Sequence, residues 1–285
     1  MRPKPAPVGV GVGAVWVDGE VVAPGQATVS AFDHGLTVGD GVFETLRLYR
    51  GTPFALGRHL DRLARSAAGL GLVLPDRAVL EGAVAEVVAA AGMADARMRV
   101  TVTAGPAPLG SGRGATGPTV IAAVAALDTF GPTASVALVP WARNERSAVV
   151  GLKTTSYAEN VVALAHALER GATEAIFANT RGELCEGTGS NVVLGMGGRL
   201  LTPPLSSGCL AGITRALVLE VCDVAEADLP LAALAEADEA FLTSTTREVQ
   251  PIASADGQPL GAAPGPLTRA AMSSYAALVA ADLDP

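Results

Sequence analysis

The stretch that decides the fold is Val42-Phe43-Glu44-Thr45-Leu46-Arg47-Leu48-Tyr49, together with the segment 56–70 that follows it. The first stretch predicts a strand, which the turn residues Arg50-Gly51-Thr52-Pro53 bring to an end. The second stretch predicts an amphipathic helix, because its apolar residues recur at helical spacing. These residues are Leu56, Leu60, Leu63, Ala67 and Leu70.

Alternation of side chains gives the strand two different faces. One face carries Val42, Glu44, Leu46 and Leu48, and its three aliphatic residues suit packing against the 56–70 helix. The other face carries Phe43, Thr45, Arg47 and Tyr49. An aromatic wall, a hydroxyl and a guanidinium suit an anionic substrate. The same spacing equally fits a half-buried sheet face from which Arg47 reaches solvent.

Outward from this core, strands and helices mix along the whole chain. Asp18-Gly19 between two short apolar runs predicts a hairpin over residues 14–22. A second helix is expected over 77–91, a long Gly/Pro-rich loop over 105–118, and a helix from Gly212 to about Val224. The other expected strands and helices are 97–104, 119–126, 134–140, 158–170, 239–243 and 267–281. This mixture predicts an α/β (α+β) fold with two lobes rather than one doubly wound sheet.

The expected domain organisation follows from the breaks in this pattern. Residues 1–127 form an N-terminal α/β domain, of which the Pro-rich residues 1–8 are expected to be frayed. Residues 128–133, which begin Asp-Thr-Phe-Gly-Pro, form the linker, and residues 134–285 form a C-terminal domain.

Composition narrows the function classes. The formal net charge of −8 lacks the clustered Lys and Arg of a nucleic-acid-binding protein, and no apolar run is long enough to span a bilayer. The N-terminus has no apolar signal-peptide region, so a soluble, cytoplasmic protein is expected. Three dispersed cysteines and three dispersed histidines predict neither disulfides nor a metal site.

Lysine is scarce, occurring only at positions 4 and 153. Lys153 follows the largely apolar residues 149–152 and precedes the hydroxyl residues Thr154-Thr155-Ser156. Desolvation lowers the pKa of a lysine and makes its neutral amine available for Schiff-base chemistry. The same pattern also fits a surface lysine on a loop.

Other segments offer groups that bind phosphate. Gly212-Ile213-Thr214-Arg215 opens a predicted helix, whose first amides and Thr hydroxyl could hold an anion. Thr243-Ser244-Thr245-Thr246 ends a strand with four hydroxyls, and Arg62 supplies a guanidinium fork. Each also has a purely structural explanation. The Thr at position 214 could cap the helix, residues 243–246 could form a polar turn, and Arg62 could be a solvated charge on its helix. Glu186 could keep a heterocyclic nitrogen protonated, or could simply form a turn.

Six segments, taken together and in order, resemble the class IV aminotransferases, the pyridoxal-phosphate enzymes of fold type IV. The segments are 33–47, 59–63, 151–157, 182–194, 210–215 and 241–252. This family includes branched-chain aminotransferases, D-amino-acid aminotransferases and 4-amino-4-deoxychorismate lyases. One such motif would be weak evidence for the family, whereas six motifs in the right order are specific evidence for it.

The resemblance implies a homodimer, pyridoxal 5'-phosphate as cofactor, a small N-terminal α/β lobe and a larger C-terminal, cofactor-binding lobe with a barrel-like sheet. It makes Lys153 the catalytic residue, which forms the Schiff base and then moves the substrate's proton. Glu186 matches the acid that pairs with the pyridine nitrogen and keeps the ring an electron sink. The other implied cofactor-binding residues are Arg62, Tyr157, Gly189, Asn191, Gly212, Ile213, Thr214, Ser244 and Thr245. Tyr157 lies four residues after the lysine, whereas branched-chain enzymes carry a Tyr five residues after it.

The substrate prediction rests on the strand face that carries Phe43, Thr45 and Arg47. The pattern F-x-T-x-R resembles the lyases, because branched-chain enzymes have Gly at position 45 and D-amino-acid enzymes have Tyr, Val and Lys at the three positions. We therefore predict a 4-amino-4-deoxychorismate lyase of folate biosynthesis, which forms 4-aminobenzoate and pyruvate while Arg47 holds a substrate carboxylate. The alternative is transamination of a branched-chain L-amino acid or a D-amino acid with 2-oxoglutarate. A binding protein that lost the chemistry is a further alternative, but it would need neither Lys153 nor Glu186.

Overall fold

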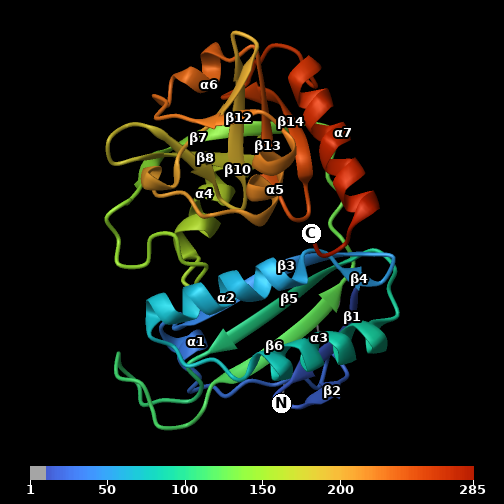
Figure 1. The fold of residues 1–285 in the computed structure, drawn as a ribbon. Coiled ribbons are helices and arrows are strands. Elements are labelled where there is room, and N and C mark those ends of the chain that lie inside the picture. Colours follow the sequence, from blue (N-terminus) through green and yellow to red (C-terminus); the bar gives the residue numbers. More distant parts are fainter. Residues whose placement is uncertain (1–10) are drawn as a thin grey trace. The chain divides into compact units, whose positions relative to one another are not determined.

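The computed structural model describes residues 11–285, which form two compact units (Figure 1). Of the described residues, the first unit comprises those up to Asp128 together with Lys153–Ser156 and Asp284. The second unit comprises Thr129–Leu152, Tyr157–Leu283 and Pro285. The segment Lys153–Ser156 thus belongs to the first unit, although its position in the chain suggested the C-terminal domain. Residues 1–8, expected to be frayed, lie outside the described residues.

The first unit is built on a six-stranded sheet in which every pair of neighbours is antiparallel. The strand order is β2 (Glu20–Val22), β1 (Val12–Val17), β6 (Thr119–Ala125), β5 (Ala96–Thr103), β3 (Gly41–Tyr49) and β4 (Thr52–Pro53). The β1–β2 turn needs positive φ at Asp18 and Gly19, at 44° and 109°, which explains the Asp-Gly pair.

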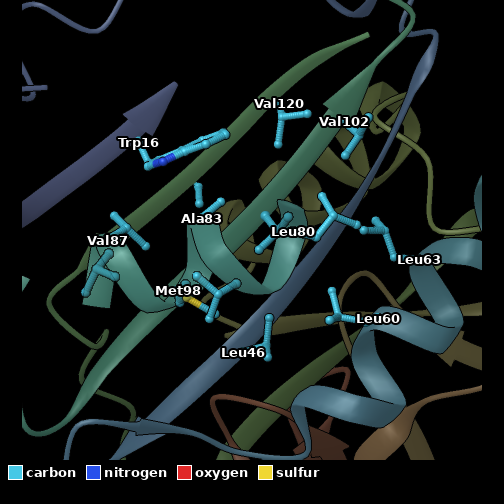
Figure 2. Close-up of a cluster of buried hydrophobic side chains, with 14 of the residues drawn as sticks. Trp16, Leu46, Leu60, Leu63, Leu80, Ala83, Val87, Met98, Val102 and Val120 are labelled. Atoms are coloured by element: carbon cyan, nitrogen blue, oxygen red, sulfur yellow. The ribbon is translucent and has the colours of Figure 1, made fainter. Parts of the chain in front are cut away.

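Two helices cover one face of this sheet, α2 (Leu56–Leu70) on β3 and α3 (Arg77–Ala91) on β1 and β6. Leu46 and Leu48 of β3 are fully buried against Leu60 and Leu63 of α2 within one apolar cluster, part of which Figure 2 shows. The predicted inward face of β3 therefore packs as expected. Burying each such leucine contributes about 1.5–3 kcal/mol to the free energy of unfolding.

The second unit contains a nine-stranded mixed sheet. Its main order is β12 (Val224–Glu226), β11 (Arg199–Thr202), β10 (Asn191–Met196), β13 (Glu239–Ser244), β14 (Glu248–Ala255), β7 (Ala134–Arg143), β8 (Glu174–Asn179) and β9 (Leu184–Gly187). The short β15 (Gln258–Pro259) pairs with β14. The sheet curls, because β9 at one end of this order also lies beside β10. The expected two-lobed α/β fold is confirmed.

Helices flank this sheet. The helix α4 (Ala158–Glu169) packs its alanines on β7 and β8, while α5 (Ile213–Val221) and α7 (Pro266–Ala281) pack on β13 and on each other. The remaining helical segments are short: α1 (His34–Thr37) in the first unit, and η1 (Leu205–Ser207) and α6 (Ala233–Glu236) in the second. Within residues 11–285, no helix is both long and apolar enough to cross a membrane.

The predicted helix beginning at Gly212 is the main misplaced element. The sequence pattern extends it to about Val224, but α5 ends at Val221 and Cys222 is extended, with φ −132° and ψ 152°. Strand pairing explains the difference, since Val224–Glu226 adds a parallel strand to β11. Tertiary hydrogen bonds here override a helical apolar pattern.

Candidate active site

The backbone of Lys153 is fixed by hydrogen bonds within the first unit. Phe43 N–H donates to the Lys153 carbonyl at 3.0 Å, and Thr155 N–H donates to the Gly41 carbonyl at 2.8 Å. Lys153 N–H donates in turn to Ser66 Oγ on α2 at 3.1 Å. These bonds make residues 153–155 a short extension of the sheet along β3, so the position of the lysine is set by both the sheet and α2.

The Lys153 amine lies over an aromatic ring of β3. Its Nζ is 4.3 Å from the centroid of the Phe43 ring, and Arg99 Cζ lies 3.6 Å from the same centroid. Arg99 stands on β5 directly opposite Thr45 in the register. The outward face of β3 therefore gathers an aromatic ring, a hydroxyl residue, a guanidinium and the amine, and the guanidinium beside the ring is that of Arg99.

Arg47, which is expected to hold a substrate carboxylate, pairs in the structure with the carboxylate of Asp95. Its Nε and Nη2 donate to the two carboxylate oxygens of Asp95 at 3.0 and 3.1 Å, and its guanidinium lies 4.6 Å from the Tyr49 ring centroid. Arg99, which the sequence patterns above do not single out, is the guanidinium that shares a ring with the lysine. Alternation along 97–104, combined with antiparallel pairing to β3, could have placed Arg99 on this face.

Arg62 takes part in a buried cluster with Glu44 and His59. Arg62 Nε donates to Glu44 Oε1 at 2.7 Å and Nη2 donates to Oε2 at 2.6 Å, while His59 Nδ1 bonds the same Oε2 at 2.6 Å. All three side chains are at most 6% exposed. Burial opposes the charge of Glu44, but the Arg62 guanidinium and the His59 hydrogen bond outweigh it and lower the pKa of Glu44 to about 2. Burial lowers the pKa of His59, so this imidazole is neutral and donates from Nδ1.

In the second unit, Glu186 is a tethered carboxylate. Its Oε2 accepts a hydrogen bond from Leu210 N–H at 2.8 Å, and its Oε1 lies 3.2 Å from Arg143 Nε. Arg143 and Glu186 are close enough for an ion pair, but the N–H of Arg143 Nε is not aligned for a hydrogen bond. The side chain is 13% exposed. Glu186 thus stands at the end of β9 as an oriented anion, which suits a cationic N–H of a ligand.

The start of α5 has features that suit the predicted anion site. The helix begins after Gly212 without a side-chain cap, so the dipole and first amides are not satisfied by a capping side chain. A Cβ on Gly212 would clash with Asn191 Oδ1, so any other residue here would displace the Asn191 amide or the start of α5. Asn191 is held by its own bond to the Leu210 carbonyl at 2.9 Å, and Thr214 is buried.

Hydroxyls of the β13–β14 connection belong to the same unit. Asn191 stands opposite Thr243 in the β10–β13 register, and α5 packs on β13. The buried Thr243 hydroxyl makes no hydrogen bond within the described chain. Ser244 Oγ accepts the Arg247 N–H at 3.2 Å, and Thr245 follows in the turn. The second unit therefore brings together Asn191, Gly212–Thr214 and the end of β13.

The remaining predicted site residues have plainer surroundings. Tyr157 precedes α4 as its N-cap residue, in the second unit, while Lys153 belongs to the first. Gly189 is exposed in the turn after β9, and a Cβ added there would meet nothing within 4 Å. Across residues 11–285, no group of three His, Cys, Asp or Glu side chains is arranged to hold a metal ion.

Comparison with known proteins decides the family. Residues 41–255 match the family model described as amino-transferase class IV. The chain belongs to the class IV aminotransferases. It is 34% identical to the D-alanine aminotransferase of Bacillus licheniformis over 277 residues, covering 90% of this chain and 93% of that enzyme. The family expected from the six ordered motifs, and with it a pyridoxal-phosphate-dependent enzyme, is confirmed.

Solved structures of this family share the fold along nearly the whole chain. The branched-chain aminotransferase of Thermoproteus uzoniensis with norvaline superposes with a TM-score of 0.88 at 33% identity, covering 94% of this chain and 95% of that one. A hypothetical aminotransferase from Mycobacterium tuberculosis in its PLP-bound form gives 0.85 at 28% identity, covering 94% and 99%. These relatives are aminotransferases, so they favour the transaminase alternative over the predicted lyase.

The residues present fit pyridoxal phosphate by their donor chemistry. The uncapped start of α5 and the lack of a side chain at Gly212 suit a phosphate group, and the buried Thr243 hydroxyl has no hydrogen-bond partner in the described chain. Glu186 offers an oriented carboxylate for a pyridinium N–H. Lys153 is the only lysine in the described part of the chain, and its amine lies against the apolar ring of Phe43.

Glu44→Gln tests the buried cluster. Removing the charge leaves the Arg62 guanidinium buried without its counter-ion, so we expect the free energy of unfolding at pH 7 to fall by about 3–5 kcal/mol. Denaturant unfolding followed by circular dichroism measures the change. Because the pKa of Glu44 is lowered to about 2, its stabilisation is present above pH 4.5 and is lost between pH 4.5 and 2. The variant should therefore lose less stability than the wild type over that range.

Glu81→Gln is the matched control for this change. Glu81 pairs with Arg77 on the exposed side of α3, where both side chains are about half exposed. Exposed pairs contribute at most about 1 kcal/mol. Equal losses of unfolding free energy in the two variants would contradict the prediction that the buried cluster stabilises the protein more than an exposed ion pair does.

Proposed function

We propose that the protein is an amino-acid aminotransferase that exchanges the amino group of a small aliphatic amino acid with 2-oxoglutarate. The observation that carries the proposal is the Lys153 amine, held at the edge of the first sheet over Phe43 and near Arg99. Branched-chain L-amino acids are the preferred substrates, because branched-chain aminotransferases resemble the chain in sequence and fold. D-alanine is the second candidate, supported by the D-alanine aminotransferase relatives.

Lys153 is the acid and base of this reaction. Its neutral amine takes the proton from the Cα of the amino acid and returns a proton during amino transfer. Bound pyridoxal phosphate supplies the electron sink that makes this Cα–H acidic enough to remove. The Phe43 ring, whose centroid lies 4.3 Å from Nζ, covers one side of the amine.

The remaining residues bind and orient the cofactor and the substrate. The α5 amides at Ile213 and Thr214, with the hydroxyls of Ser244 and Thr245, hold the phosphate, and Asn191 supports that seat through the Leu210 carbonyl. Glu186 keeps the pyridine nitrogen protonated. Arg62 donates its Nε and Nη2 to Glu44, so in this proposal it contacts the phosphate through Nη1. Tyr157 and Gly189 complete the predicted cofactor contacts. Arg99 replaces Arg47 as the group that attracts a substrate carboxylate, because Asp95 already neutralises Arg47.

A substrate panel tests the function. Purified protein with added pyridoxal phosphate is given 2-oxoglutarate with L-leucine, L-valine, L-isoleucine or D-alanine, and glutamate is measured. We expect glutamate with the L-amino acids. A separate tube receives aminodeoxychorismate, and 4-aminobenzoate there, without glutamate in the panel, would overturn the proposal in favour of the lyase. No product in any tube would support a non-catalytic binding protein.

Lys153→Ala should lower the transamination rate at least ~10²–10⁴-fold, because the acid–base group is lost. Lys4→Ala, the change at the chain's one other lysine, is the control and should be silent. Borohydride reduction followed by peptide mapping gives a readout besides activity. It should place the cofactor on Lys153, and labelling elsewhere would refute the assignment.

Gly212→Ala tests the phosphate seat. The added Cβ would clash with Asn191 Oδ1, so either the amide or the start of α5 must move. Loss of one charge-assisted hydrogen bond to the phosphate should weaken pyridoxal-phosphate binding about 10–100-fold. Equilibrium titration of the apoprotein with pyridoxal phosphate and with pyridoxal measures this, and only the phosphorylated form should be affected. Gly82→Ala on α3, where a Cβ meets nothing within 4 Å, is the control.

The protein is a homodimer in this proposal. Within residues 29–38 the first unit exposes Val29, Phe32, Leu36 and Val38, at 41–69% exposure. In the second unit α4 exposes Val161, Val162 and Leu168, at 52–65%. Exposed apolar residues this close together in the chain suit an association surface better than residues scattered singly. A second copy of the chain is the occupant that the family resemblance implies.

Light scattering coupled to size exclusion should give twice the monomer mass. Leu36→Glu should shift the population towards monomer, because a charge would be buried in the interface. Val73→Glu is the matched control, since Val73 is 78% exposed and its neighbours Leu72 and Leu74 pack on the core of the first unit. A monomeric wild type, or a Leu36→Glu protein that dimerises as well as the control, would contradict this surface.

A further inference from the structure

The loop 105–118 is held against the α1 segment by hydrogen bonds. His34 N–H donates to the Gly105 carbonyl at 2.9 Å, and Ala107 N–H donates to the Phe32 carbonyl at 3.0 Å. Further along the loop, the Gly110 carbonyl is bonded by the imidazole of His34. This loop has no helix and no strand of its own, so these bonds and those of Arg113 decide its conformation.

The imidazole of His34 lies between two acceptors. Its Nδ1 is 3.0 Å from Asp40 Oδ2, and its Nε2 is 2.8 Å from the Gly110 carbonyl oxygen. His34 is 1% exposed, so water cannot substitute for either partner. A carbonyl oxygen only accepts, and a carboxylate oxygen without a proton only accepts. Both ring nitrogens must therefore carry hydrogen, which makes His34 an imidazolium in this arrangement.

Asp40 cannot supply the missing proton instead. Arg113 Nε and Nη2 donate to its two carboxylate oxygens at 2.7 and 2.6 Å. This guanidinium holds the pKa of Asp40 below its usual range, despite partial burial, so the carboxylate is charged. The hydrogen bonds to Asp40 and Gly110 raise the pKa of His34 against the opposing effects of burial and of Arg113.

The other charged neighbour of His34 is Asp33, which is fully buried. Its carboxylate is used elsewhere, accepting from the Thr103 and Thr119 hydroxyls at 2.9 and 2.7 Å and from Gly35 N–H at 2.8 Å. Arg113 also donates to the Leu70 and Gly71 carbonyls at the end of α2, at 2.8 and 2.5 Å. Arg113 therefore anchors its part of the loop independently of His34.

We propose that His34 is a proton-operated latch for the tip of this loop, residues 109–112. In its doubly protonated form the imidazole holds both Asp40 and the Gly110 carbonyl. Loss of one proton leaves a single donor, and the ionised Asp40 keeps it because a charged acceptor binds more strongly than a carbonyl. Gly110 is then released, while Arg113 stays on Asp40 and on α2.

The tip has the freedom to respond. A Cβ on Gly110 or Gly112 would meet nothing within 4 Å, and Leu109 is 75% exposed. The direction with pH follows from the raised pKa of His34. The latch is closed below the ordinary pKa of histidine and opens as pH rises through the raised value. The mobility of the tip that carries Leu109 would thus increase in alkaline conditions.

Nitrogen NMR of the holoenzyme tests the protonation directly. The chain has only three histidines, so ¹⁵N-histidine labelling gives three rings, and His34→Gln identifies one of them. We expect His34 to be doubly protonated at pH 6.5 and to titrate above the ordinary histidine range. His59, buried in the same unit beside Glu44, is the internal control and should stay neutral. A neutral, single-tautomer His34 at pH 6 would overturn the proposal without any variant.

Mobility of the tip is measured with a nitroxide on Leu109→Cys in a Cys222→Ser background, since Cys185 and Cys209 are buried. We expect a shift to the mobile component as pH rises, with the midpoint of the His34 titration. The shift should vanish when His34→Gln is added, because the amide does not titrate. The same label at Val73→Cys should show no such transition. A transition that persists in His34→Gln would refute the latch, whether or not transamination is found. Size exclusion at each pH controls for a change of oligomeric state.

Discussion

The pair of hydrogen bonds between residues 153–155 and the start of β3 is the constraint on which the proposed chemistry depends. After Asp128 the chain enters the second unit, yet it returns for Lys153–Ser156 before continuing into α4. Phe43 N–H donates to the Lys153 carbonyl, and the Gly41 carbonyl accepts from the N–H of residue 155. Ser66 Oγ of α2 accepts from the Lys153 N–H. The only lysine of the described residues is thereby fixed on a sheet rather than on a free loop. A positioned amine can act as acid and base at a defined atom, whereas a loop lysine would have to be ordered first.

One face of strand β3 packs in the core, and the other carries groups of the candidate site. Its inward residues Leu46 and Leu48 pack under α2, and Glu44 on the same face is buried with them. Burying a carboxylate among leucines is unfavourable unless it is paired, and Arg62 and His59 satisfy it from α2. The helix is thus tied to the strand by an ion pair as well as by apolar contact. Its outward neighbour Phe43 faces Lys153 and Arg99. One strand therefore couples the stability of the first unit to the placement of its reactive groups.

The sequence predicts these elements best where the local signals are complete. The helices α2 and α3 have the bounds expected of them, because Gly71 and Gly92 adopt the positive φ that ends a helix. The start of α5 was predictable from Gly212, but no glycine follows Val221, and its end depends on pairing with β11. The same limit applies to the pocket residues. Alternation correctly assigns Arg47 to the outward face of β3, yet only the neighbouring strand and Asp95 reveal that Arg99, not Arg47, accompanies the lysine.

Two buried histidines of the first unit show why sequence and burial alone do not determine charge. His34 and His59 are each 1% exposed, and each bonds a carboxylate through Nδ1. For His59, Arg62 already neutralises the shared Glu44, and burial keeps the ring uncharged. For His34 the second nitrogen also meets an acceptor, the Gly110 carbonyl, and a neutral ring cannot satisfy both partners. The chemistry of the second partner therefore decides the protonation state. For His34 that partner is a loop carbonyl, which no side-chain motif records, and a ring that donates to both acceptors is a cation.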